Sequence, residues 1–399
     1  MIKQLREQYN QAFSEAKYKA FIDDVIEKCG DEPTFRVAET PVFVPFHLKN
    51  KLLTACEDIV NVLTDPDFKN KSEGALHSSQ IVPNEDDHTL FLQLDFGICK
   101  DEDGVLVPQL IELQGFPSLY FFQSAAAECY RMHFPVPPNF DNFFNGLNKE
   151  KYIELLRQSI VGDEKPESVI LLEIEPHKQN TKIDFYATAR ELGIKILCLS
   201  ELKKDGLDLY YLNEQGKRID VRRIYNRIIF DELEKRNDLY REFDFTQPVN
   251  ATWVGHPNWF SRISKYTLPS IKSDYVPPTY FLDQLESYPA DLHNYVLKPI
   301  FSFSGMGVKI NISQEDIENI PIEERHNFIL QKKVRYADII QTPSEAAKCE
   351  IRMMFLWPAN EPKPLLINNL VRLSKGEMVG VRYNKNKDWV GGSVAFFEP

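Results

Sequence analysis

Residues 295–310 read YVLKPIFSFSGMGVKI, and the pattern of this stretch restricts the folds that the whole chain can adopt. An apolar run ends at Lys298 and Pro299, and Gly305 and Gly307 follow before a second apolar run. Glycine lets the main chain approach an anion closely, and a lysine that ends the first strand would point a cation at the same oxygens. The spacing matches neither the P-loop nor the dinucleotide-binding glycine pattern. The stretch therefore predicts either an ordinary hairpin or a glycine lid over phosphate groups.

Composition places the chain among globular proteins and excludes several classes of function. Of 399 residues, 43% are apolar and 27% are charged, and the formal net charge is −12. A nucleic-acid partner is not expected, because such partners usually require a basic surface. No window of about 18 uncharged apolar residues occurs, so no membrane partner is expected either. The six cysteines lie far apart without a C-x-x-C pair, which predicts reduced thiols and a cytoplasmic location.

The order of periodic segments predicts an α/β (α+β) protein. Helical spacing of apolar residues dominates the first part of the chain, up to about residue 72. Apolar runs on either side of Asp103-Gly104 predict a β-hairpin over residues 88–115. Two apolar runs that flank a helical segment predict a parallel βαβ unit over residues 168–198. Short strands are expected again after residue 325.

The order of short motifs in the last third of the chain resembles that of the ATP-grasp ligases. The sequence reads SK-x-x-LP from Ser264, VPPT from Val276, VLKP-x-x-S-x-SG-x-GV from Val296, ILQKKV from Ile329, CEIRMMF from Cys349 and NNLVRL from Asn368. In that family two lysines reach the nucleotide phosphates, a glycine loop forms a lid, and a strand-edge segment holds adenine. An acid-x-arginine pair lies near the ribose and the phosphates. The resemblance assigns nucleotide contacts to Lys265, Lys298, Ser302, Ser304, Gly305, Gly307, Gln331, Lys332, Val334, Glu350, Arg352 and Arg372, with Lys298 and Arg352 also catalytic.

Such ligases bind Mg²⁺ through carboxylate and amide oxygens, which are the ligands that this ion prefers. No matching pair of strands follows Arg372, but residues 92–115, LQLDFGICKDEDGVLVPQLIELQG, contain the same arrangement. Asp95 lies on the first predicted strand, and Glu112 and Gln114 share one face of the second because side chains alternate along a strand. The sequence therefore resembles a circularly permuted ATP-grasp protein, similar to eukaryotic-type glutathione synthetase and glutathionylspermidine synthetase. The resemblance implies that these three residues bind the metal.

The resemblance also implies an activity and a domain order. The expected reaction is ATP-dependent ligation of a carboxylate to an amine through an acyl phosphate, on an amino acid, peptide or polyamine. The implied cofactors are ATP and Mg²⁺, the partners are small-molecule carboxylates and amines, and a homodimer is one expected assembly. The implied parts are a helical region at 1–75, a permuted segment with the metal hairpin at 76–150, a βαβ substrate domain at 151–255 and a nucleotide-binding domain at 256–399.

Three positions depart from the pattern of the glutathione-type relatives. Gln93 stands where those relatives have an arginine, Gln114 where the usual residue is asparagine, and Ser302 where they have a glutamate. These departures leave open a nucleotide-binding homologue without ligase turnover. A small-molecule kinase and a non-catalytic interaction domain are further alternatives. Arg227 also has two interpretations, because it can face the acceptor substrate or pair with an acidic residue at 231–232.

Overall fold

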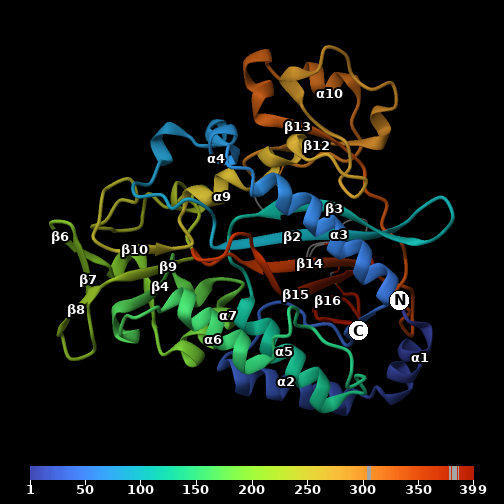
Figure 1. Ribbon diagram of the computed structural model, residues 1–399, viewed down its shortest axis with the longest axis horizontal. Coiled ribbons are helices and arrows are strands. Elements are labelled where there is room, and N and C mark those ends of the chain that lie inside the picture. The colour runs from blue at the N-terminus through green and yellow to red at the C-terminus, as the bar shows by residue number, and fades with distance from the viewer. Residues whose placement is uncertain (303–306, 377–378, 380–383, 385) are drawn as a thin grey trace.

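The computed structural model describes residues 1–302, 307–376, 379, 384 and 386–399, which form a mixed α/β protein with several sheets (Figure 1). The helices are α1 (Lys3–Ala12), α2 (Glu15–Cys29), α3 (Phe46–Leu63), α4 (Phe68–Lys71), α5 (Tyr120–His133), α6 (Lys149–Ile160), α7 (Lys182–Leu192), α8 (Phe230–Leu233), α9 (Asn258–Arg262) and α10 (Gln314–Glu318). Within the described part of the chain, none of the helices has the length and apolar character needed to cross a bilayer.

The largest sheet combines strands from distant parts of the sequence (Figure 1). Its strands, in order across the sheet, are β16 (Gly391–Ser393), β15 (Leu365–Ser374), β14 (Lys348–Leu356), β2 (Phe91–Lys100) and β3 (Leu106–Gln114). All neighbouring strands are antiparallel. The hairpin predicted over residues 88–115 is confirmed by β2 and β3. Because β2 also pairs with β14, the hairpin and the C-terminal strands form one continuous surface.

One face of this central sheet is apolar and packs against α3, which runs across it in Figure 1. Leu94 and Phe96 of β2 and Ile351 of β14 are fully buried in the same cluster as Leu52 and Ile59 of α3. Burying a large apolar side chain contributes about 1.5–3 kcal/mol each. Since side chains alternate along a strand, the intervening residues of β2 and β14 point to the opposite face. That second face is free to carry polar residues.

A second sheet is parallel and contains the predicted βαβ unit. Its strands, in order across the sheet, are β10 (Thr252–Val254), β9 (Arg223–Asn226), β4 (Val169–Glu173) and β5 (Lys195–Cys198). The helix α7 connects β4 to β5, which confirms the prediction for residues 168–198. A small antiparallel sheet follows β5 in the chain and consists of β6 (Lys203–Asp205), β7 (Asp208–Leu212) and β8 (Arg218–Val221). Near the two ends of the sequence, β1 (Val42–Val44) pairs in parallel with β17 (Ala395–Phe397).

A three-stranded antiparallel sheet contains the start of the glycine stretch and lies at the top of Figure 1 with α10. Its strands, in order, are β11 (Thr279–Phe281), β13 (Phe328–Lys332) and β12 (Tyr295–Pro299). The strand expected after the glycines is reduced to one bridge between Leu297 and Lys309. Gly307 has φ +72°, and a Cβ there would lie 2.8 Å from Cγ of Pro299, so this turn requires glycine. Ser304 and Gly305 lie outside the described residues.

Candidate functional site

A row of charged side chains crosses the face of the central sheet that points away from α3. Asp95 on β2 lies opposite Arg352 on β14, and paired residues in a sheet share a face. Glu112 on β3 lies opposite Asp95 on its other side. Arg372 on β15 lies opposite Glu350 on β14. The sheet therefore brings together the charged residues that the sequence assigned to a metal ion and to a nucleotide.

Arg352 is held in a fixed orientation by two residues of β2. Its Nε and Nη2 donate to the two carboxylate oxygens of Asp95 at 2.6 and 2.7 Å. Its Nη1 donates to Oε1 of Gln93 at 2.6 Å, and the amide of Gln93 donates to the carbonyl of Ser118 at 3.0 Å. A bidentate pair between arginine and carboxylate fixes the guanidinium plane. Gln93 stands where the glutathione-type relatives are expected to have an arginine. In this structure it supports Arg352, which comes from the neighbouring strand.

Arg372 connects two buried carboxyl groups. Its Nη2 donates to Asp95 and forms an ion pair with Glu350, whose Oε2 accepts a hydrogen bond from the Tyr336 hydroxyl at 2.7 Å. Burial acts to raise the pKa of Asp95, but the charges of Arg352 and Arg372 outweigh burial and hold that pKa below its ordinary value. Burial instead dominates at Glu350 and raises its pKa, although Arg372 opposes the shift. Asp95 is therefore the anion that both arginines share.

The three predicted metal ligands do not form an open cation site. Both oxygens of Asp95 are bonded to arginines, and Oε1 of Glu112 accepts from Nε2 of Gln114 at 2.8 Å. The same Oε1 lies 4.0 Å from the guanidinium groups of both Arg352 and Arg372. Among the described residues, no three His, Cys, Asp or Glu side chains are grouped to hold a metal. This arrangement does not fit Mg²⁺, which needs free oxygen ligands. In the structure, Asp95 is a partner of arginines. Metal binding by Glu112 and Gln114 stays a prediction.

The two predicted phosphate lysines approach the same carboxylate. Nζ of Lys298, on β12, donates to Oε1 of Gln331 at 2.6 Å and to a main-chain carbonyl of β3 at 3.3 Å. Nζ of Lys265 donates to the carbonyl of Ser302 at 2.6 Å. Burial lowers the pKa of both lysines, that of Lys298 to about 8, and the charge of Glu112 opposes the shift in each case. The charge of Glu112 therefore acts on both lysines, and its carboxylate lies 4.0 Å from the two arginines.

The segment predicted to hold adenine lines a separate hollow. Lys332 and Val334 face a cavity of about 740 Å³, together with side chains of the β2–β3 hairpin such as Lys100 and Gln109. Gln331 points inward, is 1% exposed, and its Nε2 has no hydrogen-bond partner in the part of the chain described here. A buried amide donor without a partner is costly in the free protein. Of the predicted nucleotide residues, Lys332 and Val334 face this hollow, whereas Arg352 and Arg372 face a larger one.

The larger cavity, of about 1090 Å³, lies between the central sheet and the parallel sheet. In parallel sheets, ligands bind outside the carboxyl ends of the strands. The residues that face the cavity from the central sheet are Glu112, Gln114, Arg352 and Arg372, and those from the ends of β4 and β9 and the start of α7 include Glu173, Gln179, Thr181 and Arg227. Because charged groups from two sheets face one another across it, this cavity is the candidate site.

Arg227 carries an open positive charge on the second wall. It is 6% exposed and lies over the rings of Phe116 and Phe185 at 4.8 and 5.4 Å, while its Nε and Nη1 have no hydrogen-bond partner among the described residues. In the described part of the chain, these two nitrogens therefore do not form the pairing with residues 231–232 that was considered from the sequence. Burial raises the pKa of Glu173 to about 8, against the opposing charge of Arg227, so this carboxyl group is mostly protonated at neutral pH. Glu173 was not predicted as a site residue, although a carboxylate at the end of an apolar strand was a usable signal in the sequence.

Gly97 on β2 determines where the tyrosine that contacts Glu350 can lie. A Cβ at Gly97 would be 2.8 Å from Cε1 of Tyr336. We expect Gly97→Ala to displace the ring and to lower the free energy of unfolding by about 1–3 kcal/mol, measured by urea denaturation. The same substitution in a Tyr336→Leu background should cost much less, because the ring is gone. An equal loss in both backgrounds would contradict this explanation.

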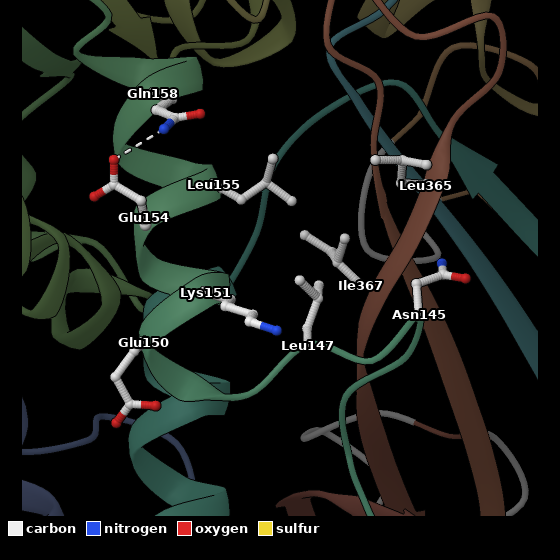
Figure 2. Close-up of a pocket in the computed structure, with 9 residues that line it drawn as sticks. All are labelled: Asn145, Leu147, Glu150, Lys151, Glu154, Leu155, Gln158, Leu365 and Ile367. Atoms are coloured by element: carbon white, nitrogen blue, oxygen red, sulfur yellow. Dashed lines mark hydrogen bonds between the residues drawn. The ribbon is translucent and has the colours of Figure 1, made fainter.

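A third hollow, between α6 and β15, has a different character (Figure 2). Its volume is about 540 Å³, and apolar side chains line it from both elements: Leu147, Leu155, Leu365 and Ile367. Lys151 is the single cation among the nine residues that line it. This hollow is therefore not a candidate for binding a polyanion.

Comparison with known proteins identifies the fold. No family model matches the chain, and no curated protein matches it by sequence. Among solved structures, a glutathione synthetase-like effector from Globodera pallida in its apo form superposes with a TM-score of 0.56 at 10% identity, over 97% of this chain and 98% of that chain. A putative gamma-glutamylcysteine synthetase from Methylobacillus flagellatus KT covers 88% of this chain and 87% of its own at 13% identity, but its TM-score of 0.37 supports no argument. The chain thus has the overall fold of a glutathione synthetase-like protein.

Proposed function

We propose that the chain is an ATP-dependent carboxylate–amine ligase with a circularly permuted ATP-grasp fold. The observation that carries this proposal is the convergence of Lys265, Lys298, Arg352 and Arg372 around Glu112 beside a large cavity. Four cations around one carboxylate favour a polyanionic ligand such as a nucleotide phosphate chain. The fold shared with a glutathione synthetase-like effector is consistent with this class of enzyme.

The sheet order supports the permuted arrangement. The hairpin that carries Glu112 precedes the remaining strands of the central sheet by more than 200 residues, yet β2 pairs directly with β14. In the proposed permutation, this hairpin takes the place that a C-terminal pair of strands has in an unpermuted relative. The permuted order of the strands along the chain leaves the face of the central sheet continuous, because this face is determined by which strands pair and not by their order in the sequence.

In the proposed reaction, a substrate carboxylate oxygen attacks the γ-phosphorus of ATP and the bond to the ADP oxygen breaks. The amine nitrogen then attacks the carbonyl carbon of the acyl phosphate, and inorganic phosphate leaves. Lys265 and Lys298 would neutralise charge on the phosphate oxygens. Arg352 is already fixed by Asp95, so its charge needs no reorganisation during the reaction. Closure of the cavity would protect the acyl phosphate from water.

The second wall of the cavity indicates the class of substrate. Arg227 is buried, and among the described residues its Nε and Nη1 have no hydrogen-bond partner, while burial raises the pKa of neighbouring Glu173 to about 8. A buried guanidinium with two unpartnered nitrogens fits a carboxylate. An amino acid or a peptide therefore suits this wall better than a polyamine, which would bring further positive charge.

A second candidate is a homologue that binds ATP without ligase turnover. The specific observation in its favour is that Asp95 is fully engaged by Arg352 and Arg372, which leaves the predicted metal set incomplete. Ser302 adds to it, because this residue supplies no carboxylate to the lid. Binding of ATP with no ADP released in any mixture of carboxylates and amines would favour this candidate.

The proposal predicts a stabilisation by ATP that depends on Lys298. A ligand at 100 times its dissociation constant stabilises the folded state by about 2.7 kcal/mol. We expect thermal unfolding to show such a shift for the native protein and for Lys309→Met, which removes an exposed lysine of the same segment. Lys298→Met should fold but show no shift. An equal shift in all three proteins would place the nucleotide elsewhere.

Turnover is measured next as the release of ADP from ATP. Amino acids and short peptides are screened in pairs, one compound supplying the carboxylate and the other supplying the amine. Release that requires both substrates supports the ligase. In that case Arg227→Met should raise KM for one substrate with little change in the KM for ATP, because Arg227 lies on the wall opposite Arg352 and Arg372. A stabilisation by ATP without ADP release would instead support the binding protein.

A further inference from the structure

The charges around Glu112 favour an anion over a metal ion. Two guanidinium groups lie 4.0 Å from its Oε1, and the lysines Lys265 and Lys298 are close enough to interact with it electrostatically. The carboxylates in the same group are Glu112 itself, Asp95, Glu350 and Asp231, whose charge acts on Lys265. The four cations therefore equal the four acidic groups in number when all the acids are ionised, and burial raises the pKa of Glu350 and of Asp231. A divalent cation needs free oxygen ligands, and carboxylates that are paired with arginines do not supply them.

We propose that the wall of the cavity formed by the central sheet binds a phosphate-bearing ligand through the fixed guanidinium groups of Arg352 and Arg372. No divalent ion is held there by side chains of the protein. The inference rests on the proposed function, because it concerns how the same cavity binds a nucleotide. It assigns Arg352 the role of a binding residue and Asp95 and Gln93 the role of positioning residues. The chemical class of ligand is a nucleoside triphosphate or another condensed phosphate.

The positions of the arginines make a metal ion incompatible with the present arrangement. A divalent ion on Glu112 would lie close to the guanidinium groups of Arg352 and Arg372, whose positive charges would repel it. Moving Arg352 away would break its bidentate pair and leave Asp95, which is 1% exposed, with Arg372 as its remaining arginine partner. Removing one partner of a buried ion pair is strongly unfavourable. Arg352 is therefore part of the folded core and cannot yield its place to an ion.

The positioning of Arg352 suits a phosphate ligand. Three of its nitrogens are bonded to Asp95 and Gln93, and both of these residues lie on β2 with at most 1% exposure. The guanidinium therefore keeps one orientation while it faces the cavity. A charge that is oriented in advance loses little conformational freedom on binding. Arg372 is about one third exposed and can approach the same ligand.

Glu112→Gln separates the two possibilities by the sign of its effect. If Glu112 holds a metal ion, the substitution should weaken ATP binding more than about tenfold, since metal ligands and their supports have effects of this size. If the arginines bind the phosphates directly, it removes a negative charge from beside the ligand, and binding should be unchanged or up to about tenfold tighter. Isothermal titration calorimetry with ATP, once in EDTA and once in excess Mg²⁺, measures the dissociation constant that distinguishes the two possibilities.

We expect the native protein to bind ATP with less than about a threefold difference between EDTA and Mg²⁺. Arg352→Met should lose most of the binding in EDTA, while Arg222→Met, which removes an exposed arginine, should bind as the native protein does. Binding that appears only with Mg²⁺ and is lost in Glu112→Gln would overturn the inference. Because Arg352→Met can also fail to fold, the decision rests on Glu112→Gln, whose side chain is one third exposed.

Titration with Mn²⁺, followed by electron paramagnetic resonance, tests the metal directly and without any nucleotide. Uptake of Mn²⁺ by the native protein that is lost in Glu112→Gln would overturn the inference. Equal absence of uptake in both proteins supports it. If neither ATP nor inorganic tripolyphosphate binds under any condition, the proposed function fails, and this titration still decides whether the chain holds a metal ion at Glu112.

Discussion

Asp95→Asn is expected to lower the free energy of unfolding by about 3–5 kcal/mol, because it removes the anion that two arginines share. Asp95 is 1% exposed and accepts hydrogen bonds from both Arg352 and Arg372. The substitution keeps the shape of the side chain but leaves two guanidinium groups with less compensating charge. Urea denaturation at pH 7 measures the loss, with the exposed Asp87→Asn as the matched control.

The pH dependence of the same pair of variants gives a second check. The pKa of Asp95 is lower in the folded than in the unfolded protein, so its contribution to stability is present above the unfolded pKa and is lost as the pH falls through the folded pKa. The difference between native and Asp95→Asn proteins should therefore shrink in acid. A loss below about 1 kcal/mol at pH 7 would show that Gln93 and Glu350 alone hold the arginines.

Lys298→Met is expected to stabilise the protein in the absence of ligand. Burial lowers the pKa of Lys298 from 10.5 to about 8, and one pKa unit corresponds to about 1.4 kcal/mol, so the buried charge costs on the order of 3 kcal/mol at pH 7. The ammonium group is bonded to Gln331 and to one main-chain carbonyl, and losing these bonds reduces the gain by about 1–2 kcal/mol. A net gain of about 1–2 kcal/mol at pH 7 remains.

The sign of the pH effect makes this prediction specific. The folded pKa of Lys298 lies below the unfolded value, so the folded state binds fewer protons between pH 8 and 10.5, and the penalty disappears as the pH rises through this range. The stability difference between Lys298→Met and the native protein should therefore decrease by about 3 kcal/mol from pH 7 to pH 10.5. Lys309→Met should show no such trend, and a constant difference for Lys298→Met would contradict burial of the charge. Stabilisation together with loss of the ATP effect is typical of a functional residue.

The secondary structure of the site region could be predicted from local patterns. Alternating apolar residues around Asp103-Gly104 predicted the β2–β3 hairpin, and the pattern at 168–198 predicted the βαβ unit that forms one wall of the cavity. The period of two also predicted that Glu112 and Gln114 share a face. These features depend on residues near one another in the sequence, where the periodicity of a strand or helix fixes the side-chain direction.

The partners of the charged residues could not be predicted in the same way. Asp95 is predicted from the sequence to bind a metal ion, and only the structure shows that it accepts hydrogen bonds from Arg352, 257 residues later in the chain. Arg227 was left between two interpretations, and its lack of an ion pair is visible only in three dimensions. The division of the adenine segment and the arginines between two cavities was likewise not visible in the sequence.

The sequence by itself determined the hairpin, the βαβ unit and the set of charged residues that could act together, because each follows from local periodicity and residue chemistry. Only the tertiary structure decided that β2 pairs with β14, which places Asp95 beside Arg352 and turns the expected metal ligand into the support of an arginine. The physical reason is that the state of a buried charge depends on which opposite charge lies within a few ångströms. That neighbour is chosen by strand pairing over long separations in the chain.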